Sequence, residues 1–278
     1  FDEENIVYWM AFQILMGNVD TQNRNVYLYS PLNSDIWYFI AWDNDGCLMR
    51  SEYELKNFSD QGSWEKGISN YWGNVLFQRC LKSRSFREKL NDAILDLREY
   101  LNKDMLTSKI ESYKNVLKPY LYLMPDAEYE PLTSEQYDQI AASLPDEIEK
   151  NYQLYLESLE TPMPFYIGVP SIDGDKLKFN WDISYDLDAE DITYSVEVAR
   201  DYLFQDVIYQ NTTLTVPESE MELPNAGQYF VRVRATNTSG KTQDAFDYYV
   251  TDEGKHYGMK CFYITEDSTV EEDNYEEG

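Results

Sequence analysis

Residues 5–16 (NIVYWMAFQILM) are apolar on every side of a helical wheel. A helix of this kind offers no face to water, so protein must surround it. Its cover either comes later in the chain or has been removed with sequence upstream. The chain opens on the acidic stretch FDEE, lacks an initiator Met and has nothing like a signal peptide at its start. We therefore expect a processed or excised piece of a longer protein.

The residues that follow predict a short hairpin and then a helical layer. Two β-prone runs, 26–30 and 36–42, flank a turn-rich stretch at 31–35. From about 72 to 159 apolar residues recur at helical spacing, which predicts an all-helical packing layer. Its core stripe comprises Phe86, Leu90, Ile94, Leu97 and Leu101, continued by Ile110, Tyr113 and Leu117; Ser85 with Glu88, and Thr133 with Gln136, match capping boxes.

After the linker at 161–164 (TPMP) the pattern changes to short alternating strands, which is typical of a two-sheet sandwich. The stretch from Leu223 to Tyr229, followed by FVRVRA, resembles the corner and F strand of fibronectin type III domains. In that resemblance Trp181 is the core tryptophan, and the Tyr229 hydroxyl bonds to backbone near the preceding turn. The expected strands are 176–181, 194–199, 207–209, 229–235 and 246–250.

The expected fold class is a multidomain α+β protein, in which a mainly helical domain precedes an all-β immunoglobulin/fibronectin III-like sandwich. We place the first domain at 1–160 and the sandwich at 161–252. Residues 253–278 hold one further candidate strand (MKCFYI) and an acidic tail that we expect to be disordered from Thr265 onward.

Charge and residue counts exclude several function classes. The chain has 23 Lys+Arg against 51 Asp+Glu, a formal net charge of −28, which disfavours nucleic acid and anionic membrane surfaces as partners. It suits divalent cations, basic partner proteins or plain solubility. His256 is the single histidine, so Ser-His-Asp and Cys-His catalysis are excluded, and a metal site must use oxygen ligands. No apolar stretch is long enough for membrane insertion.

Two short motifs carry the candidate chemistry. Asp20 and Asn25 have the spacing D-x-x-x-x-N, and Asp43 follows at the end of a β-run, just before Asp45-Gly46. In protein kinases an Asp at the first position accepts the proton of the attacking hydroxyl, and the Asn turns back toward the metal. A second Asp after a strand pair also binds metal. Each motif alone is equally well explained by ordinary turn chemistry, and both interpretations stay open on these grounds.

The run N-V-D, N-V-Y-L-Y and W-Y-F-I-A-W-D-N-D-G resembles the core signature of the CotH (spore coat protein H) kinase-like family, as does the later W-G-N-V-L. The resemblance covers about residues 1–159 and implies a kinase C-lobe-like domain. It implies Asp20 as the catalytic acid, Asp43 as a metal ligand with Asn25 as a second, and Asp45 as a motif member without an assigned role; Arg24 is a candidate phosphate contact.

The same resemblance implies the cofactors and the biological setting. Mg²⁺ or Mn²⁺ and ATP are the expected cofactors of the parent protein, and Ser/Thr hydroxyls of spore-coat or surface proteins are the expected acceptors. The expected location is the spore coat or the outer surface of a Gram-positive bacterium. No Gly-rich loop or Lys–Glu pair precedes Asp20. We therefore expect this piece to lack the nucleotide-holding N-lobe, to bind metal weakly and to transfer nothing by itself.

Three alternatives remain. Asp43, Asp45, Gly46 and Glu52 fit positions 3, 5, 6 and 12 of an EF-hand loop, although Ala41 then stands at position 1. A non-catalytic structural or adhesion protein of a spore coat or cell surface explains the sandwich equally well. Aromatic residues of the sandwich also allow contact with carbohydrate.

Overall fold

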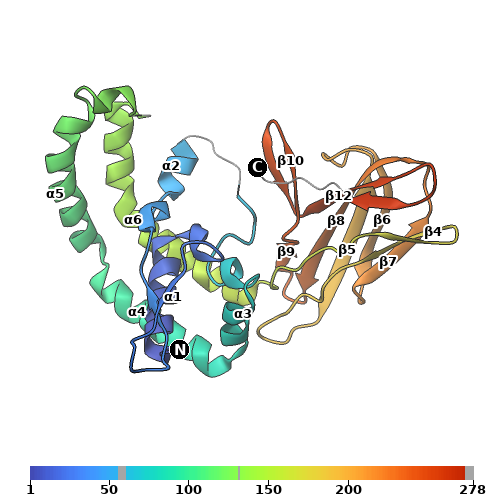
Figure 1. Ribbon diagram of the computed structural model, residues 1–278, viewed down its shortest axis with the longest axis horizontal. Coiled ribbons are helices and arrows are strands. Elements are labelled where there is room, and N and C mark those ends of the chain that lie inside the picture. Colours follow the sequence, from blue (N-terminus) through green and yellow to red (C-terminus); the bar gives the residue numbers. More distant parts are fainter. Residues whose placement is uncertain (56–60, 131, 273–278) are drawn as a thin grey trace. The chain divides into compact units, whose positions relative to one another are not determined.

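The computed structural model describes residues 1–55, 61–130 and 132–272. The chain divides into two compact units, one formed by Phe1–Ser59 with Lys66–Leu156 and the other by Asp60–Glu65 with Glu157–Gly278. The described residues are 39% helical and 26% strand with several antiparallel sheets, which confirms a mixed helix-and-sheet class. Helices predominate in the first unit and strands in the second (Figure 1).

The first unit is mainly helical. Its α-helices are α1 (Glu3–Met16), α2 (Arg50–Leu55), α3 (Val75–Lys82), α4 (Arg84–Tyr100), α5 (Lys103–Leu121) and α6 (Ser134–Glu160). Its strands are β1 (Tyr27–Tyr29) and β2 (Tyr38–Ile40), and short 3₁₀ helices occur at η1 (Val19–Thr21), η2 (Asn44–Gly46), η3 (Ser69–Tyr71) and η4 (Asp126–Glu128).

Helix α1 forms the core of this unit, as its apolar sequence predicts. The Asp2 side chain caps it by accepting a hydrogen bond from the Asn5 amide at 2.9 Å. Trp9 is buried and stacks on Phe77 of α3, with ring centroids 5.6 Å apart. The helix packs on α4 and β2, so its cover does come later in the chain. Tyr8 is an exception, because it is 38% exposed.

Strands β1 and β2 pair antiparallel, with Leu28 opposite Phe39. The outer edge of β2 does not meet another strand at Phe39. There the Asn5 side chain of α1 donates to the Phe39 carbonyl at 3.2 Å and accepts from the Phe39 amide at 2.6 Å. One side-chain amide therefore takes the place of a neighbouring strand and fixes the hairpin to the first helix.

The predicted helix caps are right in one case and wrong in the other. Thr133 and Gln136 form the expected reciprocal capping box, with distances of 2.9 and 3.2 Å. At α4, however, Ser83 is the N-cap and accepts from the Phe86 amide, while Ser85 lies within the helix. The correct cap lies two residues earlier because Arg84 is already helical.

The predicted core stripe is correct along α4 and wrong along α5. Phe86, Leu90 and Ile94 are buried. Tyr113 and Leu117 of α5 are 62% and 51% exposed, contrary to the prediction that they belong to the core. Helical periodicity identifies an apolar face but does not show whether another element covers it.

The second unit consists of antiparallel strands. Its larger sheet has the order β13-β12-β8-β5-β6, with β9 also paired to β8, and a second sheet has the order β3-β4-β7; β10 and β11 form a separate pair. The strands are β3 (Ser171–Asp173), β4 (Lys176–Asn180), β5 (Ile192–Ala199), β6 (Val207–Leu214), β7 (Glu218–Glu222), β8 (Gly227–Asn237), β9 (Thr242–Asp244), β10 (Tyr248–Thr251), β11 (Gly254–Tyr257), β12 (Met259–Ile264) and β13 (Val270–Glu272).

The two larger sheets share one hydrophobic core. Phe179 of β4 and Val196 of β5 belong to the same buried cluster, together with Trp181. The Tyr229 hydroxyl donates to the Asn225 carbonyl at 2.8 Å, as the sequence predicted. These contacts place the inward side chains of β4, β5 and β8 in a common interior.

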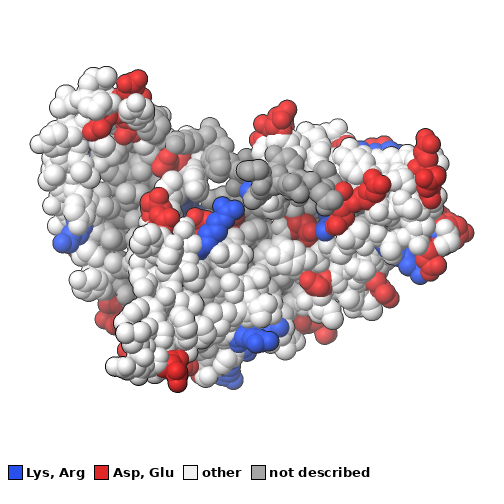
Figure 2. Space-filling view, in the orientation of Figure 1, with Lys and Arg blue, Asp and Glu red and all other residues white. Residues whose placement is uncertain are grey.

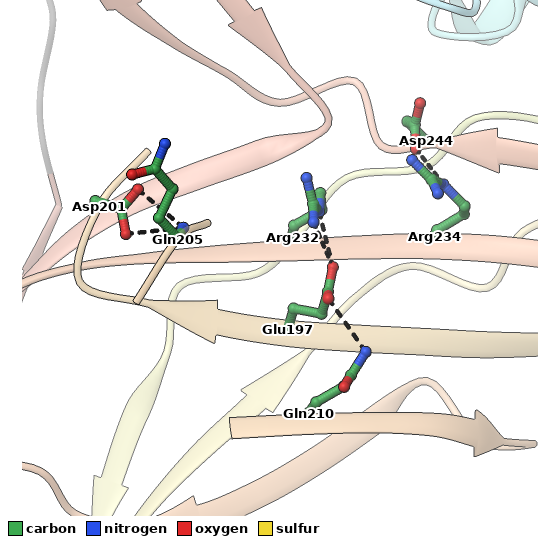
Figure 3. Close-up of polar contacts among 7 residues, drawn as sticks. All are labelled: Glu197, Asp201, Gln205, Gln210, Arg232, Arg234 and Asp244. Carbon is green, nitrogen blue, oxygen red and sulfur yellow. Dashed lines mark hydrogen bonds and ion pairs between the residues drawn. The ribbon is translucent and has the colours of Figure 1, made fainter. Parts of the chain in front are cut away.

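The outward side chains of the larger sheet pair by charge (Figure 3). Arg232 of β8 donates to Glu197 of β5, and Gln210 of β6 donates to the same carboxylate at 3.2 Å. The Arg232 guanidinium also lies over the Phe204 ring, 4.0 Å from its centroid. Such cross-strand pairs each contribute about 0.2–1 kcal/mol to sheet stability.

The expectation of disorder from Thr265 onward is wrong for part of that segment. Val270–Glu272 form β13, which pairs antiparallel with β12. Lys260 of β12 holds this edge by donating to Glu272 at 3.1 Å. An ion pair with the preceding strand therefore offsets the acidic composition that predicted disorder. Residues 273–278 lie outside the described part of the chain.

Candidate active site

The loop that carries Asp20 begins where α1 ends. Gly17 adopts a left-handed conformation (φ 64°), and its amide donates to the Ile14 carbonyl at 3.1 Å. Glycine is also required for space, because an added Cβ would lie 2.6 Å from the Asn151 side-chain nitrogen. That nitrogen donates to the Leu15 carbonyl at 3.0 Å, so α6 fixes the end of α1.

Polar residues of the η3–α3 segment, two of them buried, hold the loop in place. The Thr21 and Tyr71 hydroxyls are 2.9 Å apart, and both residues are buried. Asn70 donates to the Val19 carbonyl at 3.1 Å, and Asn74 donates to the Gln22 carbonyl at the same distance. Burial raises the pKa of Tyr71 far above its usual value, so this hydroxyl stays protonated. The loop is thus tied to fixed elements at several points.

Within the loop, the two predicted site residues meet. The Asn25 side chain donates to a carboxylate oxygen of Asp20 at 2.9 Å. Asn25 has a positive φ of 54°, a conformation that Asn tolerates better than most residues. Asp20 itself is exposed. The D-x-x-x-x-N spacing therefore places the Asn25 side chain within hydrogen-bond distance of Asp20. Arg24 lies exposed between them.

The second motif forms a tight turn after β2. Asp43 has a positive φ of 50° and precedes the 3₁₀ turn η2, which includes Asp45 and Gly46. Asp43 and Asp45 are both exposed, and within the described part of the chain their carboxylates make no hydrogen bond or ion pair. The turn thus presents two carboxylates to solvent.

Asn18 connects the turn to the loop. This residue is 2% exposed, and its side chain accepts from the Asp20 amide at 3.3 Å and donates to Asn44 at 3.4 Å. Gln13 of α1 also donates to Asn44, at 3.0 Å. An added Cβ at Gly46 would lie 3.0 Å from the Asn18 side chain and 4.0 Å from the Asp20 Cβ. The two predicted motifs are therefore packed against each other.

The free thiol of Cys47 lies beside Asn18. Burial raises the pKa of Cys47 to about 12, although a hydrogen bond with Asn18 acts in the opposite direction. The thiol is consequently protonated at neutral pH and a poor nucleophile. Cys47 is a structural neighbour of the site rather than a reactive group.

The donor atoms suit a hard divalent cation that is shared with a substrate. Among residues 1–55, 61–130 and 132–272, no group of three or more His, Cys, Asp or Glu side chains could hold a metal. Magnesium is commonly bound by one or two carboxylates plus substrate phosphates rather than by a complete protein cage. Asp43 and Asp45 offer carboxylate oxygens and Asn25 offers an amide oxygen, which are the ligand types that such a site uses. The EF-hand alternative lacks its entering helix, because β2 precedes Asp43.

A family model described as CotH kinase protein matches residues 1–155, which is more than half of the chain. The chain belongs to the CotH kinase protein family. This confirms the predicted family, and a kinase family implies the use of ATP and a divalent metal. No curated protein matches the chain. No helix in the described residues of this CotH kinase family member is long and apolar enough to cross a membrane.

Two solved structures show distant similarity to this CotH family chain. The twitchin kinase region from C. elegans (Fn31-NL-kin-CRD-Ig26) has 16% identity and a TM-score of 0.25, covering 34% of this chain and 20% of that chain. Surface layer protein SbsC, domains 1–6, has 15% identity and a TM-score of 0.18, and the match covers 99% of this chain and 38% of that chain. This chain spans less than two thirds of the length of either matched chain. Scores this low carry no argument about the fold.

Several residues that build the site in this CotH family member were not predicted from the sequence. Asn18, Asn44, Tyr71 and Asn74 supply hydrogen bonds that join the loop to the turn and to the η3–α3 segment. Asn74 lies in the W-G-N-V-L stretch, which was noticed only as part of the family pattern. Polar residues inside otherwise apolar segments were the available signal, because a buried amide needs partners.

Proposed function

We propose that this chain carries the phosphoryl-transfer site of an atypical protein kinase, which passes phosphate from ATP to Ser or Thr hydroxyls of spore-coat or surface proteins. One observation carries the proposal. The Asp20 loop and the Asp43 turn are joined through the buried Asn18, while Asn25 bonds back to Asp20. Turn chemistry alone explains each motif, but it does not explain why two motifs 18 residues apart are packed together.

In this proposal each residue has a separate role. Asp20 accepts the proton of the attacking hydroxyl, and its bond from Asn25 holds the carboxylate in one orientation. Asp43 and the Asn25 amide oxygen would hold Mg²⁺ or Mn²⁺, with Asp45 adding negative charge beside them. When bound, the metal neutralises charge on the ATP phosphates. Positioning by the Tyr71 and Asn74 contacts lowers the entropy cost of reaching the reactive geometry.

We also propose the finer architecture and setting. The first unit corresponds to a kinase C-lobe, supported by the order of helix, loop, hairpin, acidic turn and helical layer. The second corresponds to a fibronectin III-like sandwich, supported by the buried Trp181 and the Tyr229–Asn225 hydrogen bond. A spore coat or the outer surface of a Gram-positive bacterium is the proposed location, on the strength of the family.

Metal binding tests the site directly. Mn²⁺ is titrated by calorimetry into residues 1–278 with a non-hydrolysable ATP analogue present, and into Asp43→Asn and Asp35→Asn. Asp35 is a matched control because it is an exposed Asp in the hairpin turn, away from the motifs. We expect Asp43→Asn to weaken Mn²⁺ binding at least tenfold and Asp35→Asn to leave it unchanged. Equal affinities in both variants would leave Asp43 as a turn residue and favour a non-catalytic scaffold.

Transfer of labelled phosphate from ATP to casein by the full-length parent protein tests the chemistry. Asp20→Asn is the variant, and Asp35→Asn is again the control. Removing a general base costs about 10²–10⁴-fold in rate. If the parent protein is active and Asp20→Asn retains its full rate, the assignment of the base is wrong. The calorimetric test is independent of this assay, because it measures metal binding at Asp43 and requires no phosphate transfer.

A further inference from the structure

Helix α5 leaves an apolar face uncovered. Tyr113, Val116, Leu117 and Tyr120 are 62%, 62%, 51% and 65% exposed. Their spacing of three and four residues places them along one side of the helix. Such a row is normally buried, because most helical stability in proteins comes from packing an amphipathic face.

The row continues past the helix end. Leu123 is 58% exposed and Met124 is 73% exposed. We call these six residues, Tyr113, Val116, Leu117, Tyr120, Leu123 and Met124, the α5 stripe. A whole aromatic side chain has about 150–250 Å² of surface and an aliphatic one somewhat less, so these exposed fractions leave on the order of 600 Å² of the α5 stripe uncovered. That equals or exceeds the largest apolar patch of a typical monomer, roughly 300–600 Å², and such patches mark interaction sites.

The neighbouring helix α6 does not use this face. Lys118 pairs with Asp138 of α6 at 2.5 Å, and Lys103 pairs with Asp146. Tyr122 meets Tyr137 edge to face at the open end. Of the 19 residues of α5, Leu106 is the one that is buried. Contacts within the unit are therefore mainly polar and leave the α5 stripe free.

We propose that the α5 stripe is a self-association surface, on which α5 of a second copy of this chain packs antiparallel. Within the helix the apolar positions 113, 116 and 120 follow the a/d spacing of a two-helix seam, and Leu123 continues the row beyond the helix end at Leu121. Two identical helices related by a two-fold axis present the same row to each other, so one stripe suffices for both partners. About 600 Å² from the stripe plus its rim approaches the roughly 800 Å² per partner of a standard interface.

Charge favours this face over the rest of the molecule. Two chains of net charge −28 repel each other, and acidic side chains are spread over the face seen in Figure 2. Residues 112–125 contain no Asp or Glu and include Lys114 and Lys118. The surface over α5 is mostly white in the same view. Two copies can therefore meet here without bringing carboxylates together.

Sedimentation equilibrium of residues 1–278 tests the proposal over roughly 1–100 µM. We expect reversible dimers, with association at least tenfold weaker in Val116→Ser/Tyr120→Ser. Both positions are exposed, so the variant should keep its helical circular dichroism. Ile183→Ser is the control, because Ile183 is 76% exposed but lies in the second unit. It should dimerise like the unaltered chain.

Salt gives a second, independent readout. Raising NaCl from about 0.05 to 0.5 M shortens the Debye length and screens the net repulsion, so dimerisation should strengthen. A chain that stays monomeric at all concentrations and salt levels overturns the proposal. So does a dimer that survives Val116→Ser/Tyr120→Ser, since it uses another face. A monomer whose intact stripe binds phosphatidylcholine vesicles, while the variant does not, would assign the stripe to lipid instead.

Discussion

Replacing Gly17 by Ala should destabilise the first unit through two separable effects. Its φ of 64° costs an L-residue roughly 1–2 kcal/mol. The new Cβ would also lie 2.6 Å from the Asn151 side-chain nitrogen, so that buried amide must move. Its hydrogen bond to the Leu15 carbonyl is then lost, which costs about 1–3 kcal/mol. The expected total is about 2–5 kcal/mol.

A double-mutant cycle separates the two effects. In an Asn151→Ala background the collision is absent, so Gly17→Ala should cost only the conformational part, about 1–2 kcal/mol. Gly174→Ala is a further control, because Gly174 has a similar φ of 62° and nothing lies within 4 Å of an added Cβ. Its cost, measured on the second unit, should also be about 1–2 kcal/mol.

Urea unfolding followed by circular dichroism at 222 nm reports the cycle. Apart from the last turn of α6, the α-helices of the described residues lie in the first unit, so this signal follows that unit. A cost for Gly17→Ala that is the same with and without the Asn151 side chain would refute the reasoning, because no coupling would then exist between the two positions.

Three further predictions concern other parts of the chain. Tyr229→Phe removes the hydroxyl that donates to Asn225, and calorimetric melting of the second unit should show a loss of about 0.5–1.5 kcal/mol; an unchanged melting temperature would contradict a stabilising role. Burial raises the pKa of Asp247 despite opposing hydrogen bonds and the charge of Lys260. A carboxyl whose folded pKa is raised costs stability as pH rises through its unfolded and then its folded pKa. Lys260→Met should raise the Asp247 pKa further. The variant should therefore lose about 1–3 kcal/mol of unfolding free energy, and more at pH 7 than at pH 4; a pH-independent loss would exclude this coupling. Since the pKa of Cys47 is about 12, about one thiol in 10⁴ is ionised at pH 8, and mass spectrometry should find Cys47 far less alkylated by iodoacetamide in folded protein than in urea; equal labelling would show that the thiol is exposed.

Local patterns were sufficient to predict several of the regular elements. The apolar run at 5–16 became α1, the β-prone runs 26–30 and 36–42 became β1 and β2, and MKCFYI became β12. In each case the signal lies within a few neighbouring residues.

Contacts between distant segments could not be predicted in this way. The hydrogen bonds of Asn18 and Asn74 join residues 26 and 52 positions apart, and an asparagine in a sequence does not indicate its partner. The exposure of Tyr113 has the same origin, since periodicity reveals a face but not its cover. β13 escaped prediction because its pairing depends on Lys260, on another strand.

The bond between Asn5 and Phe39 determines which parts of the hairpin can vary in length. Because Phe39 is fastened to the first helix, β2 takes its position from α1 and not from the turn at 31–35. Asp43 is the third residue after the end of β2, so the same helix also fixes its position. Insertions at the hairpin tip should therefore be tolerated without displacing the acidic turn, whereas a single inserted residue between Phe39 and Asp43 should shift it.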